Sequence, residues 1–315
     1  MAIPIKKGRQ AAPVREFIYG PPKVGKTTAA CDSDDPIVLS GEAGDGQFDV
    51  SRIVFDEKSG RTWPTSWDEV TKMLHQLADS KDLLGKTLVV DGLGALEKLC
   101  GSAVCAKNKW DNLGTPGYGK GESALLKEME QFLRLIERCW ANGYAVIFVS
   151  HSKIGKVKNP AGEEYTRFVP ALADINTGDV AGLFVGWVDV VLFAQVEVDV
   201  AKTDKRAIGI GTGRHVFRTK SGAAWVGGCR YENVPETMDL DHRELHRLIA
   251  EGQSPKLMLQ KVTSLLAKLP ADNDGAKAVA GWVASPGTKD VKLLCRAAAR
   301  LQSEIETHGE VAQAA

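Results

Sequence analysis

The chain has 315 residues, and its 40 lysines and arginines balance its 40 aspartates and glutamates, so the formal net charge is zero. This balance excludes a globally basic nucleic-acid-binding protein and leaves only a local basic patch for such a role. No apolar run is long enough to span a bilayer, and the first ten residues lack the apolar core of a signal peptide. The six cysteines form no C-x-x-C pair. We therefore predict a cytoplasmic protein with reduced thiols and no membrane partner.

Residues 20–28, GPPKVGKTT, match the P-loop motif G-x-x-x-x-G-K-[ST]. A short apolar strand is predicted before the motif at residues 16–19, and a helix is predicted to begin after it at residues 28–31. In this setting the loop's backbone N–H groups point at phosphate oxygens, Lys26 reaches the β- and γ-phosphates, and the Thr27 hydroxyl binds Mg²⁺. The alternative is a chance match in a flexible loop. The predicted nucleotide-binding residues are Gly20, Pro21, Pro22, Lys23, Val24, Gly25, Lys26, Thr27 and Thr28.

Three further buried strands are predicted at residues 37–40, 87–91 and 144–150, and each is followed or ended by a polar group. Glu42 comes soon after the first, and Asp91 ends the second. In P-loop folds an apolar strand near the P-loop strand delivers such an aspartate to the metal, an arrangement known as Walker B. His151 follows the third strand, where a γ-phosphate sensor would lie. The alternatives are an ordinary turn aspartate and a capping or core histidine.

Two segments combine cations with aromatic rings. Residues 107–121 follow a predicted helix at 93–106, and residues 153–168 follow the strand at 144–150; both are predicted to be flexible loops. Cations suit phosphates and rings suit unpaired bases, so both segments are candidates for binding single-stranded nucleic acid. The alternative for the first segment is a plain surface loop. The candidate DNA-binding residues are Lys107, Lys109, Trp110, Tyr118, Lys120, Lys153, Lys156, Lys158, Tyr165, Arg167 and Phe168.

Residues 187–200 and 214–220 are predicted to form a β-hairpin joined by a polar, glycine-rich linker. Arg218 and Lys220 share one face of its second strand, either as solvated edge charges or as cations offered to a neighbouring subunit's nucleotide. The predicted domains are an arm at residues 1–12, a core at 13–245 and a small helical region at 250–315. His242 and His246 share a helical face, where a solvated pair is predicted because no cysteine or carboxylate cluster has metal-site spacing beside them.

Taken in order, the segments GPPKVGKT, VLSGEAG, TLVVDGL, VIFVSHS, VDVVLF and FRTK resemble the RecA-like ATPase core, most closely that of phage-encoded single-strand annealing proteins. The resemblance covers roughly residues 14–240 and leaves the C-terminal helices outside. It implies an α/β fold: a RecA-like P-loop NTPase core with a mostly parallel twisted sheet, flanking helices and a C-terminal β-hairpin. For a phage-encoded protein, the cytoplasm would be that of the host cell.

The resemblance also implies roles for single residues. Glu42 matches the glutamate that activates the attacking water, and Asp91 matches the Walker B acid. His151 stands where RecA proteins carry a glutamine that senses the γ-phosphate and couples it to the second DNA loop. Arg218 and Lys220 fall where a neighbour's cation completes the ATP site. The histidine departs from the family pattern, as does the lack of an aromatic-x-x-Ala tether in the N-terminal arm. The implied catalytic set is Lys26, Glu42, Asp91 and His151, with Thr27 and Asp91 holding Mg²⁺.

From these features we predict an ATP-binding and ATP-hydrolysing protein that binds single-stranded DNA and promotes annealing or strand exchange as an oligomer, in a filament or a ring. A single-strand-binding protein is a further candidate partner. Two alternatives stay open. One is a nucleotide-kinase-like phosphotransferase in which residues 153–167 act as a basic lid. The other is a non-hydrolysing ATP-binding loader or assembly protein in which Glu42 is a turn residue.

Overall fold

The computed structural model describes the chain apart from residues 1–2, 6–11, 45, 159–161, 176–177, 204–205, 271–272, 286–289 and 315. The chain divides into two compact units, Met1–Gly228 and Cys229–Ala315. The boundary lies upstream of the predicted one, and residues 229–245 belong to the C-terminal unit. Most of the arm predicted at residues 1–12 lies outside the described residues. Within the described part of the chain, no helix is both long and apolar enough to cross a membrane.

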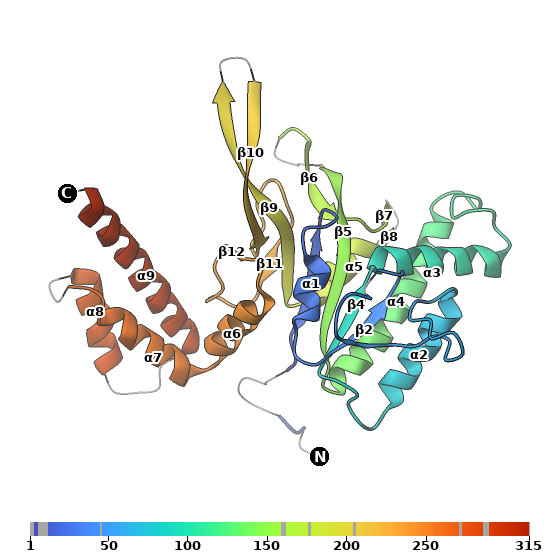
Figure 1. The fold of residues 1–315 in the computed structure, drawn as a ribbon, viewed down its shortest axis with the longest axis horizontal. Helices are drawn as coiled ribbons and strands as arrows, with labels where there is room; N and C mark the ends of the chain where they lie inside the picture. The colour runs from blue at the N-terminus through green and yellow to red at the C-terminus, as the bar shows by residue number, and fades with distance from the viewer. Residues whose placement is uncertain are drawn as a thin grey trace. The chain divides into compact units, whose positions relative to one another are not determined.

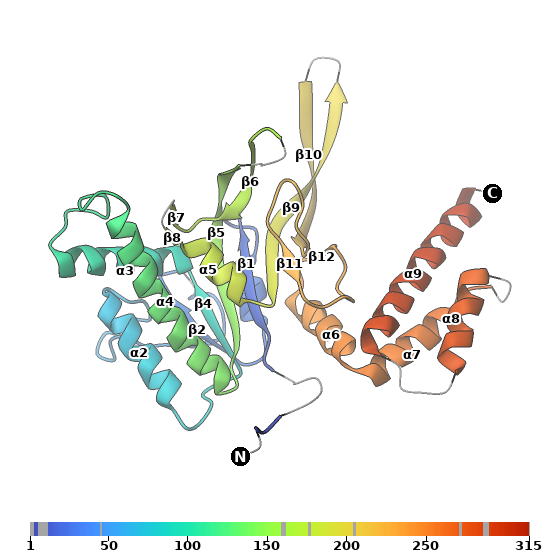
Figure 2. The same cartoon turned by 180° about the vertical axis from the view of Figure 1, so that it is seen from behind.

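A mostly parallel sheet runs through the first unit, with the spatial order β10-β9-β1-β5-β4-β2-β3 (Figures 1 and 2). The P-loop strand β1 (Arg15–Gly20) pairs in parallel with both β5 (Ala145–Val157) and β9 (Val190–Thr203). Beyond β5 the parallel sheet continues through β4 (Thr87–Asp91), β2 (Pro36–Ser40) and β3 (Ser51–Arg52). On the other side, β10 (Arg206–Arg218) runs antiparallel to β9.

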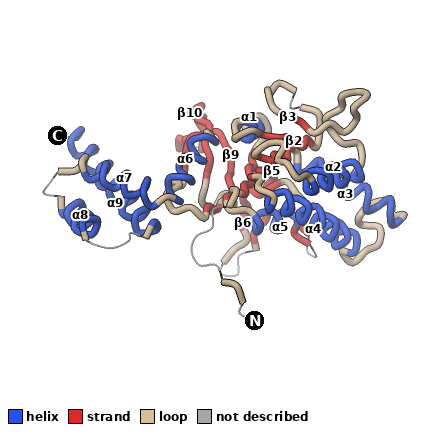
Figure 3. The backbone as a smooth tube through the Cα atoms, turned by 90° about the horizontal axis from the view of Figure 1, so that it is seen from below, coloured by secondary structure: helices blue, strands red, loops and turns tan. Residues whose placement is uncertain are grey.

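Helices flank this sheet on both faces because consecutive residues of its central strands are apolar and both faces are buried. Phe17 and Tyr19 of β1 belong to a core that includes residues of α2 (Trp67–Asp79), α3 (Leu93–Asn108), α4 (Lys120–Ala141) and α5 (Val180–Trp187). Ile18, which points to the other face, is also fully buried. α1 (Lys26–Cys31) lies on the opposite side of the sheet from α4 and α5 (Figure 3). The predicted fold class, a mostly parallel sheet between helices, is confirmed.

The flexible loop predicted at residues 153–168 is wrong, because a β-hairpin occupies most of this segment. β5 continues without a break to Val157 and pairs antiparallel with β6 (Tyr165–Pro170), in a register from Ser152↔Pro170 to Val157↔Tyr165. Exposure alternates from Lys153 to Lys158, as expected of a strand, but both faces mix apolar and basic residues, so the sequence shows no amphipathic alternation. Lysines and glycines are typical of loops, but Gly155 lies in the strand, where a Cβ atom would come within 2.9 Å of the Val169 side chain on β6.

The β9–β10 hairpin is confirmed, although most of the predicted linker at residues 202–213 belongs to its two strands. The remaining short strands are β7 (Asp174–Ile175), β8 (Gly178–Asp179), β11 (Gly228–Cys229) and β12 (Thr237–Asp239). The C-terminal unit holds α6 (His242–Gln253), α7 (Pro255–Leu266), α8 (Asp274–Ala284) and α9 (Val291–Ala314), and its own apolar core joins α7, α8 and α9.

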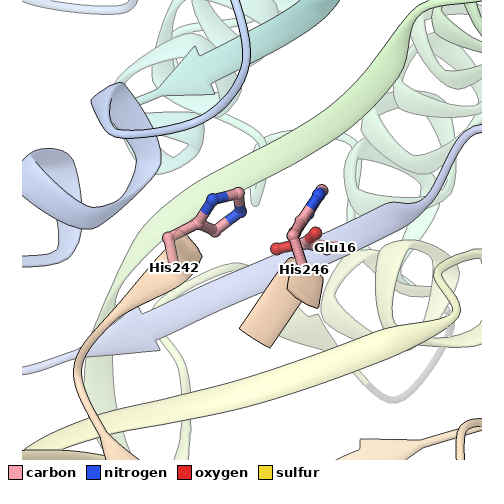
Figure 4. Close-up of side chains that lie close together, drawn as sticks. All are labelled: Glu16, His242 and His246. Carbon is pink, nitrogen blue, oxygen red and sulfur yellow. The ribbon is translucent and has the colours of Figure 1, made fainter. Parts of the chain in front are cut away.

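His242 and His246 lie one turn apart on α6, and their ring centroids are 4.3 Å apart (Figure 4). The prediction of a solvated pair is wrong for His242, which is 1% exposed. The polar residues interspersed on α6 gave no sign of this burial in the sequence.

Arg15 holds the beginning of β1 to the beginning of β9. Its guanidinium donates to both carboxylate oxygens of Asp189, at 3.0 and 2.8 Å. The guanidinium carbon also lies 4.8 Å from the ring centroids of Trp140 and Trp187. Both charged side chains are mostly buried, at 15% and 12% exposure. A bidentate ion pair between two indole rings stabilises the central strands more than an exposed pair does.

We expect Arg15→Ala to lower the free energy of unfolding by about 3 kcal/mol, because it leaves the Asp189 carboxylate without its main charge partner. The measurement is a urea titration that compares midpoints and slopes. The exposed pair Lys86–Asp34 provides the control, and Lys86→Ala should leave the midpoint close to that of the wild type. Equal effects of the two substitutions would contradict this assignment.

Candidate nucleotide site

The P-loop begins where β1 ends and has the backbone that its motif requires. A Cβ atom at Gly20 would lie 2.1 Å from the carbonyl oxygen of Ala194 on β9, so this position has room only for glycine. Lys23 and Gly25 have left-handed backbones with φ of 63° and 101°. Such turns direct successive N–H groups to one side, which is the geometry of an anion-binding loop.

Lys26 and Thr27 are the first two residues of α1. The Lys26 side chain bonds back to the P-loop, and the Thr27 side chain bonds to β4. The Lys26 ammonium donates to the Pro21 carbonyl at 2.7 Å, and the residue is 6% exposed. Burial lowers the pKa of Lys26, and the charge of Asp91 opposes that shift. The Thr27 hydroxyl donates to Asp91 Oδ2 at 2.7 Å. A hydroxyl and a carboxylate in direct contact are the oxygen donors that Mg²⁺ prefers, so the predicted metal ligands fit that ion.

The predicted catalytic residues line one cavity of about 440 Å³ together with the P-loop. They come together because the parallel pairing of neighbouring strands stops at one edge of the sheet, as the registers Ser40↔Asp91 and Gly20↔His151 show. Glu42 and His151 both line the cavity, and both are exposed. The structure thus brings Lys26, Glu42, Asp91 and His151 into one site, while their catalytic roles stay predictions.

The cavity is also lined by Gln47 and Phe48, which belong to no motif that can be identified in the sequence. They belong to the segment between β2 and β3, whose described residues form neither helix nor strand. Arg52 of β3 holds that segment by donating to the carbonyl oxygens of Phe48, at 2.5 Å, and Val50, at 3.0 Å. The aromatic ring at the cavity therefore depends on a cation four residues downstream.

The cation candidates on the β9–β10 hairpin differ in their surroundings. Arg218 lies 3.5 Å from the Glu197 carboxylate, and its guanidinium carbon lies 5.2 Å from the ring centroid of Trp225. Its side chain is 21% exposed. A role in a neighbour's ATP site would require Arg218 to leave these contacts. Lys220 lies beyond the end of β10 and is exposed.

The DNA-binding candidates on the β5–β6 hairpin fall into two groups. Lys153 donates to the Leu172 carbonyl, and Arg167 is half-buried, so both are held within the fold. The other candidates are exposed: Lys156, Lys158, Tyr165 and Phe168. The Phe168 ring stacks on the buried Phe193 ring with centroids 5.2 Å apart and remains 38% exposed.

The first candidate segment, residues 107–121, is partly helical. Lys107 lies in the last turn of α3, where it pairs with Glu128 at 3.4 Å, and Lys120 is the first residue of α4. Lys109 ends α3 as an exposed left-handed cap, and Trp110 packs against the core. Tyr118 is 99% exposed at φ 51°, between two left-handed glycines. The prediction of a flexible loop is therefore wrong for the two ends of this segment, which lie in α3 and α4.

Comparison with known proteins assigns the family. Residues 12–231 match the model of the AAA domain family. The chain belongs to this family of P-loop ATPases. The match covers the P-loop, the β4 aspartate and both hairpins, and so includes every predicted site residue. No curated protein matches the sequence.

Among solved structures, the chain is similar to a prototypical ATPase from the type III secretion system of pathogenic bacteria. The two share 13% sequence identity and a TM-score of 0.33, and the alignment covers 92% of this chain and 81% of the other. This likeness is too distant to bear on the site.

The contact between Thr27 and Asp91 predicts how nucleotide binding depends on metal. Asp91→Asn should weaken binding of ATP at least tenfold in the presence of Mg²⁺, because the donor pair then lacks its anionic oxygen. Binding without Mg²⁺ should change little. Isothermal titration with and without the metal measures both effects, and Asp68→Asn on the exposed start of α2 is the control. An equal weakening under both conditions would contradict the assignment of Asp91 to the metal.

Proposed function

We propose that this protein is an ATP-hydrolysing recombination protein, similar to phage-encoded RecA-core proteins, that binds single-stranded DNA and promotes annealing or strand exchange as an oligomer. One observation carries the proposal. β5 is a single uninterrupted strand that passes from His151 in the nucleotide cavity to Lys156 on an exposed hairpin. A nucleotide sensor and a basic, aromatic surface on one rigid strand suit an ATPase whose DNA affinity depends on nucleotide.

The P-loop, Lys26 and Thr27 would hold the triphosphate, with Thr27 and Asp91 as the ligands of Mg²⁺. Held by these two residues, Mg²⁺ would supply positive charge beside the phosphates. Lys26 would exchange the Pro21 carbonyl for phosphate oxygens, and Glu42 would orient a water molecule for in-line attack. His151 donates to the terminal phosphate and so transmits its presence to β5.

The exposed groups on the β5–β6 hairpin suit an unpaired nucleic-acid strand. Lys156 and Lys158 offer cations for phosphates, and Phe168 offers a ring that is supported from behind by Phe193. Stacking on such a ring is independent of base identity, as expected of a protein that anneals any sequence. The Tyr19 hydroxyl, one residue before the P-loop, donates to the Val226 carbonyl at 2.6 Å and lies 3.3 Å from that of Phe168. This supports a second connection between the loop and the hairpin.

The proposal predicts that Lys26→Ala abolishes ATP binding and ATP-stimulated DNA binding together, because the loop can no longer neutralise phosphate charge. The measurements are titration with ATP and fluorescence anisotropy of a labelled single-stranded oligonucleotide, with and without nucleotide. Lys72→Ala serves as the control, since Lys72 is an exposed lysine on α2 outside the cavity lining. ATP-stimulated DNA binding that persists in Lys26→Ala would contradict the proposed coupling.

Replacing both Lys156 and Lys158 by alanine should weaken binding of single-stranded DNA and reduce its dependence on salt. For single strands, each phosphate that a protein no longer neutralises reduces the steepness of log K against log salt by about 0.7. Anisotropy titrations between low and moderate salt measure this slope. The double variant Lys127→Ala, Lys72→Ala, on α4 and α2, removes the same charge elsewhere. An unchanged slope in the hairpin variant would move the DNA site to another surface.

A further inference from the structure

The P-loop contacts the β9–β10 hairpin through a side chain that the sequence patterns did not single out. His215 Nδ1 lies 2.8 Å from the carbonyl oxygen of Val24. A carbonyl oxygen can only accept, so Nδ1 carries a ring proton and donates. The two residues are 191 positions apart in the chain. The shape of the P-loop therefore depends on a strand that comes much later in the sequence.

A local irregularity in β10 directs His215 to this contact. The register between β9 and β10 shifts between Gly211 and His215, and Gly213 within this interval has φ 76°. The Thr212 hydroxyl accepts from the Arg214 N–H at 3.2 Å and donates to the Glu197 carbonyl at 3.1 Å. Such bulges bend a strand and change the direction of the side chains that follow. After this bulge, regular pairing resumes at His215, opposite Val196.

The acceptor of this hydrogen bond lies at the centre of the strained part of the P-loop. Val24 stands between Lys23 and Gly25, the two left-handed residues of the loop, and its side chain is 2% exposed. A left-handed backbone is unfavourable for lysine, so the loop needs outside contacts to keep this shape before a ligand binds. Burial holds the side chain of Val24, and the His215 hydrogen bond holds its carbonyl group.

We propose that His215 is a positioning residue that holds the P-loop in its phosphate-binding shape and makes the β9–β10 hairpin part of the nucleotide site. This inference rests on the proposed binding of nucleotide by the P-loop. His215 acts through the backbone of the loop, so its effect falls on the phosphates and is the same with or without a base and ribose. A residue that touched the nucleoside would affect only ligands that carry one.

The experiment measures the dissociation constants of two probes, MgATP and magnesium tripolyphosphate, by isothermal titration. Wild type is compared with His215→Ala, which removes the donor, and with His215→Asn, whose amide nitrogen can occupy the place of Nδ1. We expect His215→Ala to weaken both probes by the same factor, about tenfold, as for the removal of one hydrogen bond. His215→Asn should recover most of the affinity. His75→Ala, an exposed histidine on α2, should match wild type for both probes.

Given that wild type binds both probes, three results would overturn the inference. If His215→Ala weakened the binding of MgATP but not that of magnesium tripolyphosphate, His215 would contact the nucleoside. Unchanged affinity of His215→Ala for both probes would mean that the hydrogen bond does not position the loop. An asparagine variant as weak as the alanine variant, with the melting temperature of wild type, would mean that the donor is not what matters. If wild type binds neither probe, the proposed nucleotide site fails as well, and the inference fails with it.

Discussion

The nucleotide site depends on the close approach of β1 and β9 at the end of the P-loop strand. Position 20 has no room for a Cβ atom beside the Ala194 carbonyl, and this contact fixes where the P-loop leaves the sheet. The parallel neighbours β4 and β2 end at the same edge, and the pairing of β5 with β1 stops there at His151. For that reason the P-loop cavity is also lined by His151, Asp91 and Glu42, although long stretches of chain separate these residues. The Thr27–Asp91 hydrogen bond joins the two sides of the site.

The elements around the P-loop connect it to the two hairpins of the first unit. β5 continues directly from the cavity into the β5–β6 hairpin. Tyr19 bonds to the Val226 backbone, and burial raises the pKa of its hydroxyl well above the usual value, so it stays a neutral donor. His215 connects the β9–β10 hairpin to Val24. Each of these connections joins the loop to an element at the surface. A change in the shape of the loop can therefore alter the position of both hairpins.

Much of the fold and the cavity could be predicted from the sequence, because local signals and long-range order agree there. The P-loop motif and the apolar strands near Glu42, Asp91 and His151 follow from short patterns, and the mostly parallel sheet follows from the resemblance to RecA-like cores. Residues 153–157 form a strand although apolar and basic residues do not alternate along them, so their sequence gave no strand signal. The contacts of Arg218 with Glu197 and Trp225, and of His215 with Val24, depend on tertiary packing and a bulge. No pattern along the chain carries that information.

The proposed function requires that nucleotide in the P-loop cavity controls binding of single-stranded DNA. The decisive test measures binding of a fluorescent single-stranded oligonucleotide to the full chain, with and without a slowly hydrolysed ATP analogue and Mg²⁺. We expect binding that requires or is strongly enhanced by the nucleotide and that weakens with salt. Binding of equal strength in both states, or no binding in either, would contradict this function.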